Sequence, residues 1–233
     1  MKKNIFIVLL GMISTMMAKP PDVKINPIPP KDSTTIMDTS TYVLITTNMG
    51  NIKIRLYDET PQHKANFIKI IRDGVLDSTL FHRVIPQFMI QGGDPSSKYA
   101  VPGQPLGMGG LNYRVPAEFN PLLIHKRGVL AAARDGNPEK ASSSTQFYIV
   151  TGKTFTEDEL NTLTLRTGIT WTPGQREIYK TIGGAPGLDM NYTVFGEVVD
   201  GMDVVDAITQ LSRDGNDRPY EDMRMHVTIL EHK

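Results

Sequence analysis

Residues 81 to 94 of this 233-residue chain read FHRVIPQFMIQGGD, from Phe81 to Asp94. With the two-residue period of a β-strand, Phe81, Arg83 and Ile85 share one face, and Pro86 ends the run. The stretch places one permanently charged guanidinium among large apolar side chains and closes on a double glycine. This combination predicts a site for a neutral, apolar substrate that needs one strong hydrogen-bond donor.

Three other segments accompany this stretch. They read RGVLAAAR at 127–134, STQFYIV at 144–150, and LDMNYTVFGEV at 188–198 followed by GMDVV at 201–205. Together with residues 81–94, and in the same order and spacing, they resemble the cyclophilins, a family of peptidyl-prolyl cis/trans isomerases. The resemblance covers about Thr41 to His232, so we expect one isomerase domain at 41–232.

The start of this domain has clear periodicity. Alternating apolar residues at 42–47 and 52–57 flank a turn-like tetrad, which predicts a β-hairpin. A helix is expected next. Thr60 is its predicted N-cap, Pro61 suits its first turn, and Gly74 ends it.

Two further elements close the domain. Helical spacing at 202–212 predicts a second core helix, and 225–230 reads as a last strand. Strands dominate and no βαβ alternation appears, so the sequence predicts a mainly β fold. The resemblance makes this fold a closed antiparallel eight-stranded β-barrel capped by two α-helices.

Residues 152–186 carry helix signals that such a barrel does not need. Thr156 and Glu159 have the spacing of a capping box, and Pro173 begins a second helical pattern. We therefore expect a helical insertion. Its role is either a packing decoration or a rim for a partner or substrate.

Residues 1–18 predict a secretory signal peptide. Lys2 and Lys3 precede an apolar run at 5–13 that is too short to span a bilayer. Residues 19–40 are rich in proline and typical of an extended tether. We expect a periplasmic protein without stable membrane insertion after signal cleavage; an uncleaved anchor is the alternative.

The composition excludes several kinds of function. Lys+Arg and Asp+Glu both total 25, and no basic cluster interleaves with aromatic residues, so we expect no nucleic-acid partner. Cysteine is absent, which excludes disulfides and thiol catalysis. The five histidines lack paired ligand spacing, so we predict no metal site. Ser142-Ser143-Ser144 has no glycine-flanked elbow and no evident acid and histidine partner, which favours a solvated loop over a nucleophile.

Isomerisation of an Xaa-Pro bond needs neither a cofactor nor a covalent step. Rotation about a peptide bond has a barrier of about 18–20 kcal/mol because the nitrogen lone pair is delocalised into the carbonyl. Bringing this rotation to milliseconds requires about four decades, or roughly 5–6 kcal/mol of preferential transition-state binding. A guanidinium that donates to the prolyl nitrogen as it pyramidalises, in a water-poor pocket, favours the twisted state.

The resemblance assigns roles to individual residues. It makes Arg83 the catalytic donor and Gln91 the residue that orients it. The residues expected to line the proline pocket are Phe88, Met89, Tyr148 and Leu188. Those expected to hold the substrate residues before the proline are Ala133, Arg134 and Gln146. Tyr148 stands where phenylalanine is usual in the family, and Tyr192, also a substrate-binding position, stands where many members have histidine.

One position departs from the family in a way that concerns an inhibitor. Many cyclophilins carry a tryptophan immediately before the leucine that corresponds to Leu188, and its indole N–H contacts cyclosporin. Here that position is Gly187, and the single tryptophan of the chain is Trp171 in the expected insertion. We expect the drug to bind poorly unless Trp171 reaches back to fill the gap.

The sequence therefore predicts a monomeric peptidyl-prolyl cis/trans isomerase that acts on proline-containing polypeptides and assists the folding of exported proteins. The alternative is a peptide-binding or chaperone module on the same fold with little turnover. Loss of Arg83 or Gln91 would favour that alternative, and both are present.

Overall fold

The computed structural model describes residues 40–231. The predicted signal peptide and the predicted tether, except for Ser40, lie outside the described residues. The strands of the main sheet are β1 (Tyr42–Thr47), β2 (Gly50–Leu56), β3 (Phe81–Ile85), β4 (Met89–Gly92), β6 (Val129–Ala132), β8 (Phe147–Val150), β9 (Val194–Asp200) and β10 (His226–Leu230). The short strands β5 (Arg114–Val115) and β7 (Ser142–Ser143) pair with each other. The helices are α1 (Pro61–Arg72), α2 (Glu157–Thr167), α3 (Pro173–Thr181) and α4 (Met202–Thr209), with 3-10 turns η1 (Pro95–Tyr99) and η2 (Pro186–Leu188).

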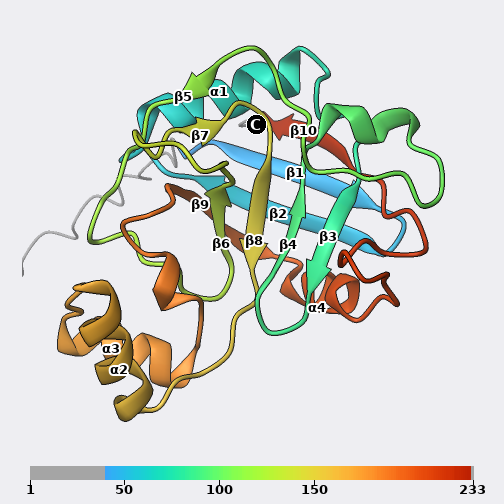
Figure 1. Cartoon of the computed structure of the whole chain (residues 1–233). Helices are drawn as coiled ribbons and strands as arrows, with labels where there is room; N and C mark the ends of the chain where they lie inside the picture. The colour runs from blue at the N-terminus through green and yellow to red at the C-terminus, as the bar shows by residue number, and fades with distance from the viewer. Residues whose placement is uncertain (1–39, 232–233) are drawn as a thin grey trace, which may run out of the picture. The chain divides into compact units, whose positions relative to one another are not determined.

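The eight strands form one curled antiparallel sheet in the order β10-β1-β2-β9-β6-β8-β4-β3 (Figure 1). The outermost strands, β10 and β3, do not pair with each other along their length. Hydrogen bonds connect only the regions where they begin: the N–H of Phe81, the first residue of β3, donates to the Met223 carbonyl, and the Met225 N–H donates to the Thr79 carbonyl, both at 2.9 Å. The predicted closed barrel is therefore a curled sheet that is not fully closed, and these few contacts between its outermost strands limit the exposed sheet edge.

Two helices pack against the barrel core, as predicted. Phe67 and Ile70 of α1 and Val205 and Ile208 of α4 belong to the same buried cluster as the inward side chains of the strands. Figure 1 shows α1 at the top and α4 at the bottom of the curled sheet. The predicted hairpin is also confirmed, since β1 pairs with β2 from Tyr42, opposite Arg55, to Thr47, opposite Gly50, across a two-residue turn.

Thr60 occupies the predicted N-cap position of α1, and α1 begins at the predicted Pro61, but the Thr60 side chain makes no capping hydrogen bond. Instead the carboxylate of Glu118 accepts from the N–H groups of Gln62 and His63, at 3.0 and 2.9 Å. A charged acceptor from a distant loop satisfies the free N–H groups of the first turn better than a hydroxyl does.

The segment between β8 and β9 folds into the two predicted helices. Thr156 and Thr172 each form a complete capping box, on α2 and α3 respectively. The helices enclose a small buried cluster of their own, built from Ile124, Leu160, Trp171 and Tyr179. In Figure 1 they lie side by side, apart from the strands. None of the helices in residues 40–231 is long and apolar enough to cross a membrane.

A β-bulge in β3 changes the predicted alternation of side chains. Phe81 pairs with Gly92 and Arg83 pairs with Gln91, so His82 is an extra residue without a partner on β4. Phe81 consequently joins the main buried cluster, whereas Arg83 lies outside it. The prediction that Phe81 and Arg83 share one face is therefore wrong.

The bulge also buries His82, which makes the stability of the fold sensitive to pH. His82 is 4% exposed, and neither ring nitrogen has a hydrogen-bond partner among the described residues. Burial lowers its pKa to about 4 from 6.5. As the pH falls below 6.5, His82 is protonated in the unfolded chain, whereas in the folded chain it stays neutral down to about pH 4. The free energy of unfolding therefore declines between pH 6.5 and pH 4, by on the order of 3 kcal/mol in total.

We expect urea titrations between pH 7 and pH 4.5 to give a smaller loss of unfolding free energy for His82→Gln than for the wild type. The burial of His63 also lowers the pKa of that histidine, but His63 is present in both proteins and cancels in the comparison. Equal pH dependence of the two proteins would show that the folded state accommodates a charged His82.

Candidate active site

The register of three neighbouring strands aligns predicted site residues in a row. Arg83 on β3 lies opposite Gln91 on β4, and Gln91 lies opposite Tyr148 on β8. Residues directly opposite each other in antiparallel strands project to the same side of the sheet. Ile90 and Ile149, the alternate residues, belong to the main core. The row therefore projects from the outer face of the barrel, and the two-residue period adds Met89 to it.

These residues line a small cavity. Its volume is about 180 Å³, whereas typical small-molecule sites measure about 300–1,000 Å³. The cavity is therefore of a size that suits a single side chain. Its lining residues are Arg83, Phe88, Met89, Gln91, Ala133, Arg134, Tyr148, Leu188 and Tyr192. Gln146 lies in the wall of an adjoining cavity of about 440 Å³, which shares Gln91, Ala133 and Arg134 with the first. The structure thus brings all ten predicted site residues together; their roles remain predictions.

A chain of side-chain hydrogen bonds orients the polar groups of the site. Arg83 Nη1 donates to Gln91 Oε1 at 3.4 Å, and Gln91 Nε2 donates to Gln146 Oε1 at 3.1 Å. Gln146 Nε2 donates to the backbone carbonyls of Gly107 and Gly109, at 2.9 and 2.7 Å. Because the last amide is held by two carbonyls, each amide has only one orientation that satisfies the chain.

Arg83 has a second partner that sequence reasoning missed. Its Nε lies 3.7 Å from Oδ2 of Asp217, whose other carboxylate oxygen lies 3.4 Å from Nε of Arg213. The backbone carbonyl of Asp217 accepts from the N–H of Val84 at 2.9 Å, which ties this loop to β3. The Arg83 side chain is 42% exposed, so the ion pair contributes little stability and mainly directs the guanidinium.

The aromatic wall of the cavity is built from Tyr148 and Tyr192, whose rings meet edge to face at 6.0 Å. The guanidinium of Arg134 lies 4.7 Å from the centre of the Tyr192 ring. The Tyr148 hydroxyl lies 3.0 Å from Nε2 of His125, a fully buried residue. Burial raises the pKa of Tyr148 well above its usual range, so the hydroxyl stays neutral. The group that distinguishes Tyr148 from phenylalanine is therefore bonded within the protein.

Trp171 does not fill the gap at Gly187. The indole is 4% exposed, packs between α2 and α3, and donates to Asp189 Oδ2 at 2.7 Å. A side chain added at Gly187 would meet no atom of the described chain within 4 Å of its Cβ. Gly187 therefore leaves open space next to Leu188.

The prediction of a solvated serine loop is wrong for Ser142. Its Oγ lies 2.9 Å from His63 Nε2, and His63 Nδ1 lies 2.6 Å from a Glu118 oxygen. This serine–histidine–glutamate order is that of a catalytic triad. However, Ser142 is 1% exposed, and the cavity beside His63 measures only about 10 Å³. With no room for a substrate, these residues serve to join β7, α1 and the loop of Glu118.

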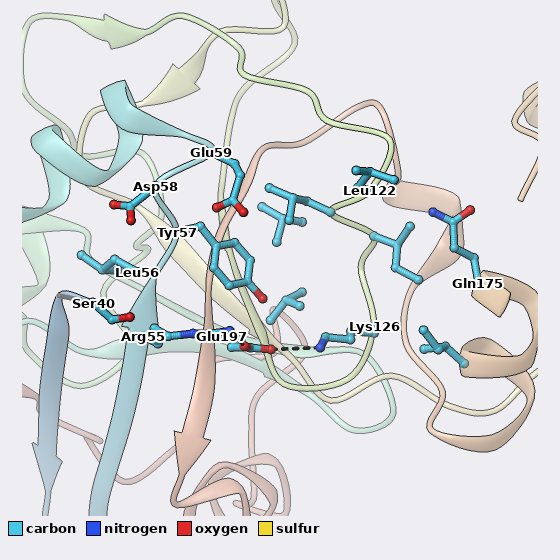
Figure 2. Close-up of a pocket in the computed structure, with 15 residues that line it drawn as sticks. Ser40, Arg55, Leu56, Tyr57, Asp58, Glu59, Leu122, Lys126, Gln175 and Glu197 are labelled. Atoms are coloured by element: carbon cyan, nitrogen blue, oxygen red, sulfur yellow. Dashed lines mark hydrogen bonds and ion pairs between the residues drawn. The ribbon is translucent and has the colours of Figure 1, made fainter. Parts of the chain in front are cut away.

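A larger cavity of about 410 Å³ lies between the ends of β2 and β9, residues 122–126 and α3 (Figure 2). Its charged groups already bind one another: Glu197 accepts from Lys126 at 2.9 Å and also from Arg55. Hydrogen bonds from these cations help to lower the pKa of Glu197, against the effect of burial. None of the predicted catalytic residues lines this cavity, so the smaller cavity at Arg83 is the candidate active site.

Comparison with known proteins gives one consistent family. The family model "Cyclophilin type peptidyl-prolyl cis-trans isomerase/CLD" matches residues 42–229. The peptidyl-prolyl cis-trans isomerase A of Dickeya dadantii is 35% identical over 195 residues, which cover 83% of each chain. The Arabidopsis thaliana peptidyl-prolyl cis-trans isomerase CYP71 is 33% identical over 192 residues, 80% of this chain and 24% of that protein.

Some relatives are much longer than this chain, which spans 37% of one from Streptococcus pyogenes. Among solved structures, a cyclophilin-type peptidyl-prolyl cis-trans isomerase of Cryptosporidium parvum superposes with a TM-score of 0.63 at 23% identity. The superposition covers 83% of this chain and 99% of that one. The same protein was also crystallised in the presence of the dipeptide Ala-Pro.

Proposed function

Because the chain belongs to the cyclophilin-type peptidyl-prolyl cis-trans isomerase family, we propose that it catalyses cis/trans isomerisation of Xaa-Pro bonds with Arg83 as the donor. The observation that carries this proposal is the position of Arg83: its guanidinium borders the cavity that Phe88 and Met89 also line, and it is held by Gln91.

The proposed mechanism is electrostatic. The proline ring enters the cavity between Phe88, Met89 and Leu188, and Arg83 donates to the prolyl nitrogen. This nitrogen has a free lone pair only when the bond is twisted, so the hydrogen bond is stronger in the transition state than in either planar state. The adjoining cavity at Gln146 holds the residues before the proline. No bond is formed or broken, and no cofactor is required.

A protease-coupled assay of the purified chain with a short Xaa-Pro peptide tests the proposal. We expect turnover well above the uncatalysed rate. Binding of the peptide without acceleration would instead support the peptide-binding or chaperone module, for which the exposed adjoining cavity is the relevant feature.

We further propose that the protein is a periplasmic monomer that acts on proline-containing exported polypeptides. This rests on the signal peptide predicted at residues 1–18. Cell fractionation with N-terminal sequencing should recover a periplasmic chain that begins after the signal peptide. Recovery of a cytoplasmic chain that begins at Met1 would contradict this location and leave the isomerase proposal untouched.

A further inference from the structure

Behind the wall of the candidate site lies a buried cluster that the proposed mechanism does not use: Asp189, His125, Trp171 and Tyr179, hereafter the Asp189 network. We infer that this network positions the wall of the proline pocket and couples it to helices α2 and α3. The inference rests on the proposed function, because it concerns the same pocket.

Asp189 is the centre of the network. Its side chain is 5% exposed. One carboxylate oxygen accepts from the backbone N–H of His125 at 2.7 Å and lies 2.8 Å from His125 Nδ1. The other accepts from Trp171 Nε1 at 2.7 Å and from the Tyr179 hydroxyl at 2.6 Å. Four donors match the four acceptor sites of a carboxylate, so the side chain is fully satisfied and its orientation is determined by its partners.

His125 connects Asp189 to Tyr148. Nδ1 faces an acceptor-only carboxylate, so it carries a proton and donates to Asp189. Nε2 lies within hydrogen-bond distance of the Tyr148 hydroxyl, at 3.0 Å. The two rings also stack, with centres 6.1 Å apart and planes inclined by 15°. Tyr148 is thus held by a hydrogen bond on the side opposite the cavity.

A second wall residue is held through the chain itself. Leu188 lines the cavity and immediately precedes Asp189. The turn that carries it is joined to His125, because the Ala185 N–H donates to the His125 carbonyl at 2.8 Å and the Leu188 N–H donates to the Ala185 carbonyl at 3.0 Å. Displacement of Asp189 would therefore move both Leu188 and Tyr148.

Two of the four donors belong to the segment between β8 and β9. Tyr179 lies in α3 and Trp171 lies just before it, and their rings meet edge to face at 5.9 Å. Both belong to the small cluster that includes Leu160 of α2. This segment therefore contributes directly to the support of the pocket wall, in addition to packing on itself.

The network should affect binding of the proline ring more than the twisting of its bond. The pocket wall contacts the ring in the planar and the twisted states alike, so its disorder raises KM and leaves kcat nearly unchanged. We expect Tyr148→Phe and Tyr179→Phe, each of which removes one hydroxyl and keeps the ring, to raise KM about threefold to tenfold, the range of one net hydrogen bond. Tyr99→Phe is the matched control, since Tyr99 is 91% exposed, and it should behave as the wild type.

Trp171 reports on the network directly, because it is the only tryptophan of the chain. We expect a saturating Xaa-Pro peptide to change its emission in the wild type. In Tyr148→Phe the peptide should still bind, as measured by calorimetry, with the emission change reduced or lost. The emission measurement on the wild type tests the inference even if the variants fail to fold.

Two results would overturn the inference. If the wild type binds the peptide and its Trp171 emission does not change, the inference is overturned and the proposed function still stands. The inference is also overturned if Tyr148→Phe shows the same emission change as the wild type and the KM of the variant is unchanged. A wild type that neither binds nor isomerises the peptide would overturn the proposed function along with the inference.

Discussion

Arg83→Ala is expected to lower kcat/KM for an Xaa-Pro peptide by one to three decades, about 1.4–4 kcal/mol, the usual effect of removing one preorganised donor. The loss should appear mainly in kcat, because Arg83 interacts most strongly with the twisted state. The fold should persist. The partners of Arg83 are Gln91, which also bonds Gln146, and Asp217, which also pairs with Arg213 and is one-third exposed.

Arg213→Ala is the matched control. It removes a guanidinium from the same carboxylate, but Arg213 does not line the cavity. Turnover should stay near the wild-type value. Arg83→Lys should recover little activity, because an ammonium lacks the rigid fork that Gln91 and Asp217 orient. A folded Arg83→Ala protein with wild-type kcat/KM would refute the proposed mechanism.

Cyclosporin should bind this chain weakly, and Gly187→Trp should strengthen the binding by about 30- to 1,000-fold. The variant would supply one large aromatic contact and one hydrogen bond, worth about 2–4 kcal/mol. The structure favours this result in two ways. Trp171 is committed to Asp189, and the space beside Gly187 is open. Calorimetric or fluorescence titration measures the change.

Peptide turnover should change little in Gly187→Trp, because Arg83 and the lining of the cavity are intact. Gly174→Trp is the matched control: Gly174 also has open space around its Cβ but lies in α3, and drug affinity should not change. Nanomolar inhibition of the wild type would mean that other contacts replace the missing indole.

Several elements could be predicted from the sequence because they depend on residues a few positions apart. The β1–β2 hairpin follows from alternation around a short turn, and the capping box of Thr156 needs only the residue three positions later. The position of Arg83 and Gln91 side by side was also within reach, since both lie in one 14-residue stretch that pairs with itself.

Other features depended on pairing in the folded chain that no local pattern reveals. Thr60 has the residue type of a cap, but Glu118 takes that role from another loop. The bulge at His82 moves Phe81 into the core, although strict alternation would place it beside Arg83. In both cases the pairing that forms in the folded chain, and not the local pattern, determines the outcome.

The family, the mainly β fold and the identity of the pocket residues follow from the amino-acid sequence alone, because these are written in contiguous segments with fixed spacing. What surrounds the pocket residues depends on the folded chain. Asp217 reaches Arg83 from the far end of the chain, and Asp189 links His125 to Trp171. The Asp189 contacts form because folding buries polar groups that must then find partners. Arg83 and Asp217 stay partly exposed, and they meet because the Asp217 loop is hydrogen-bonded to β3 in the folded chain.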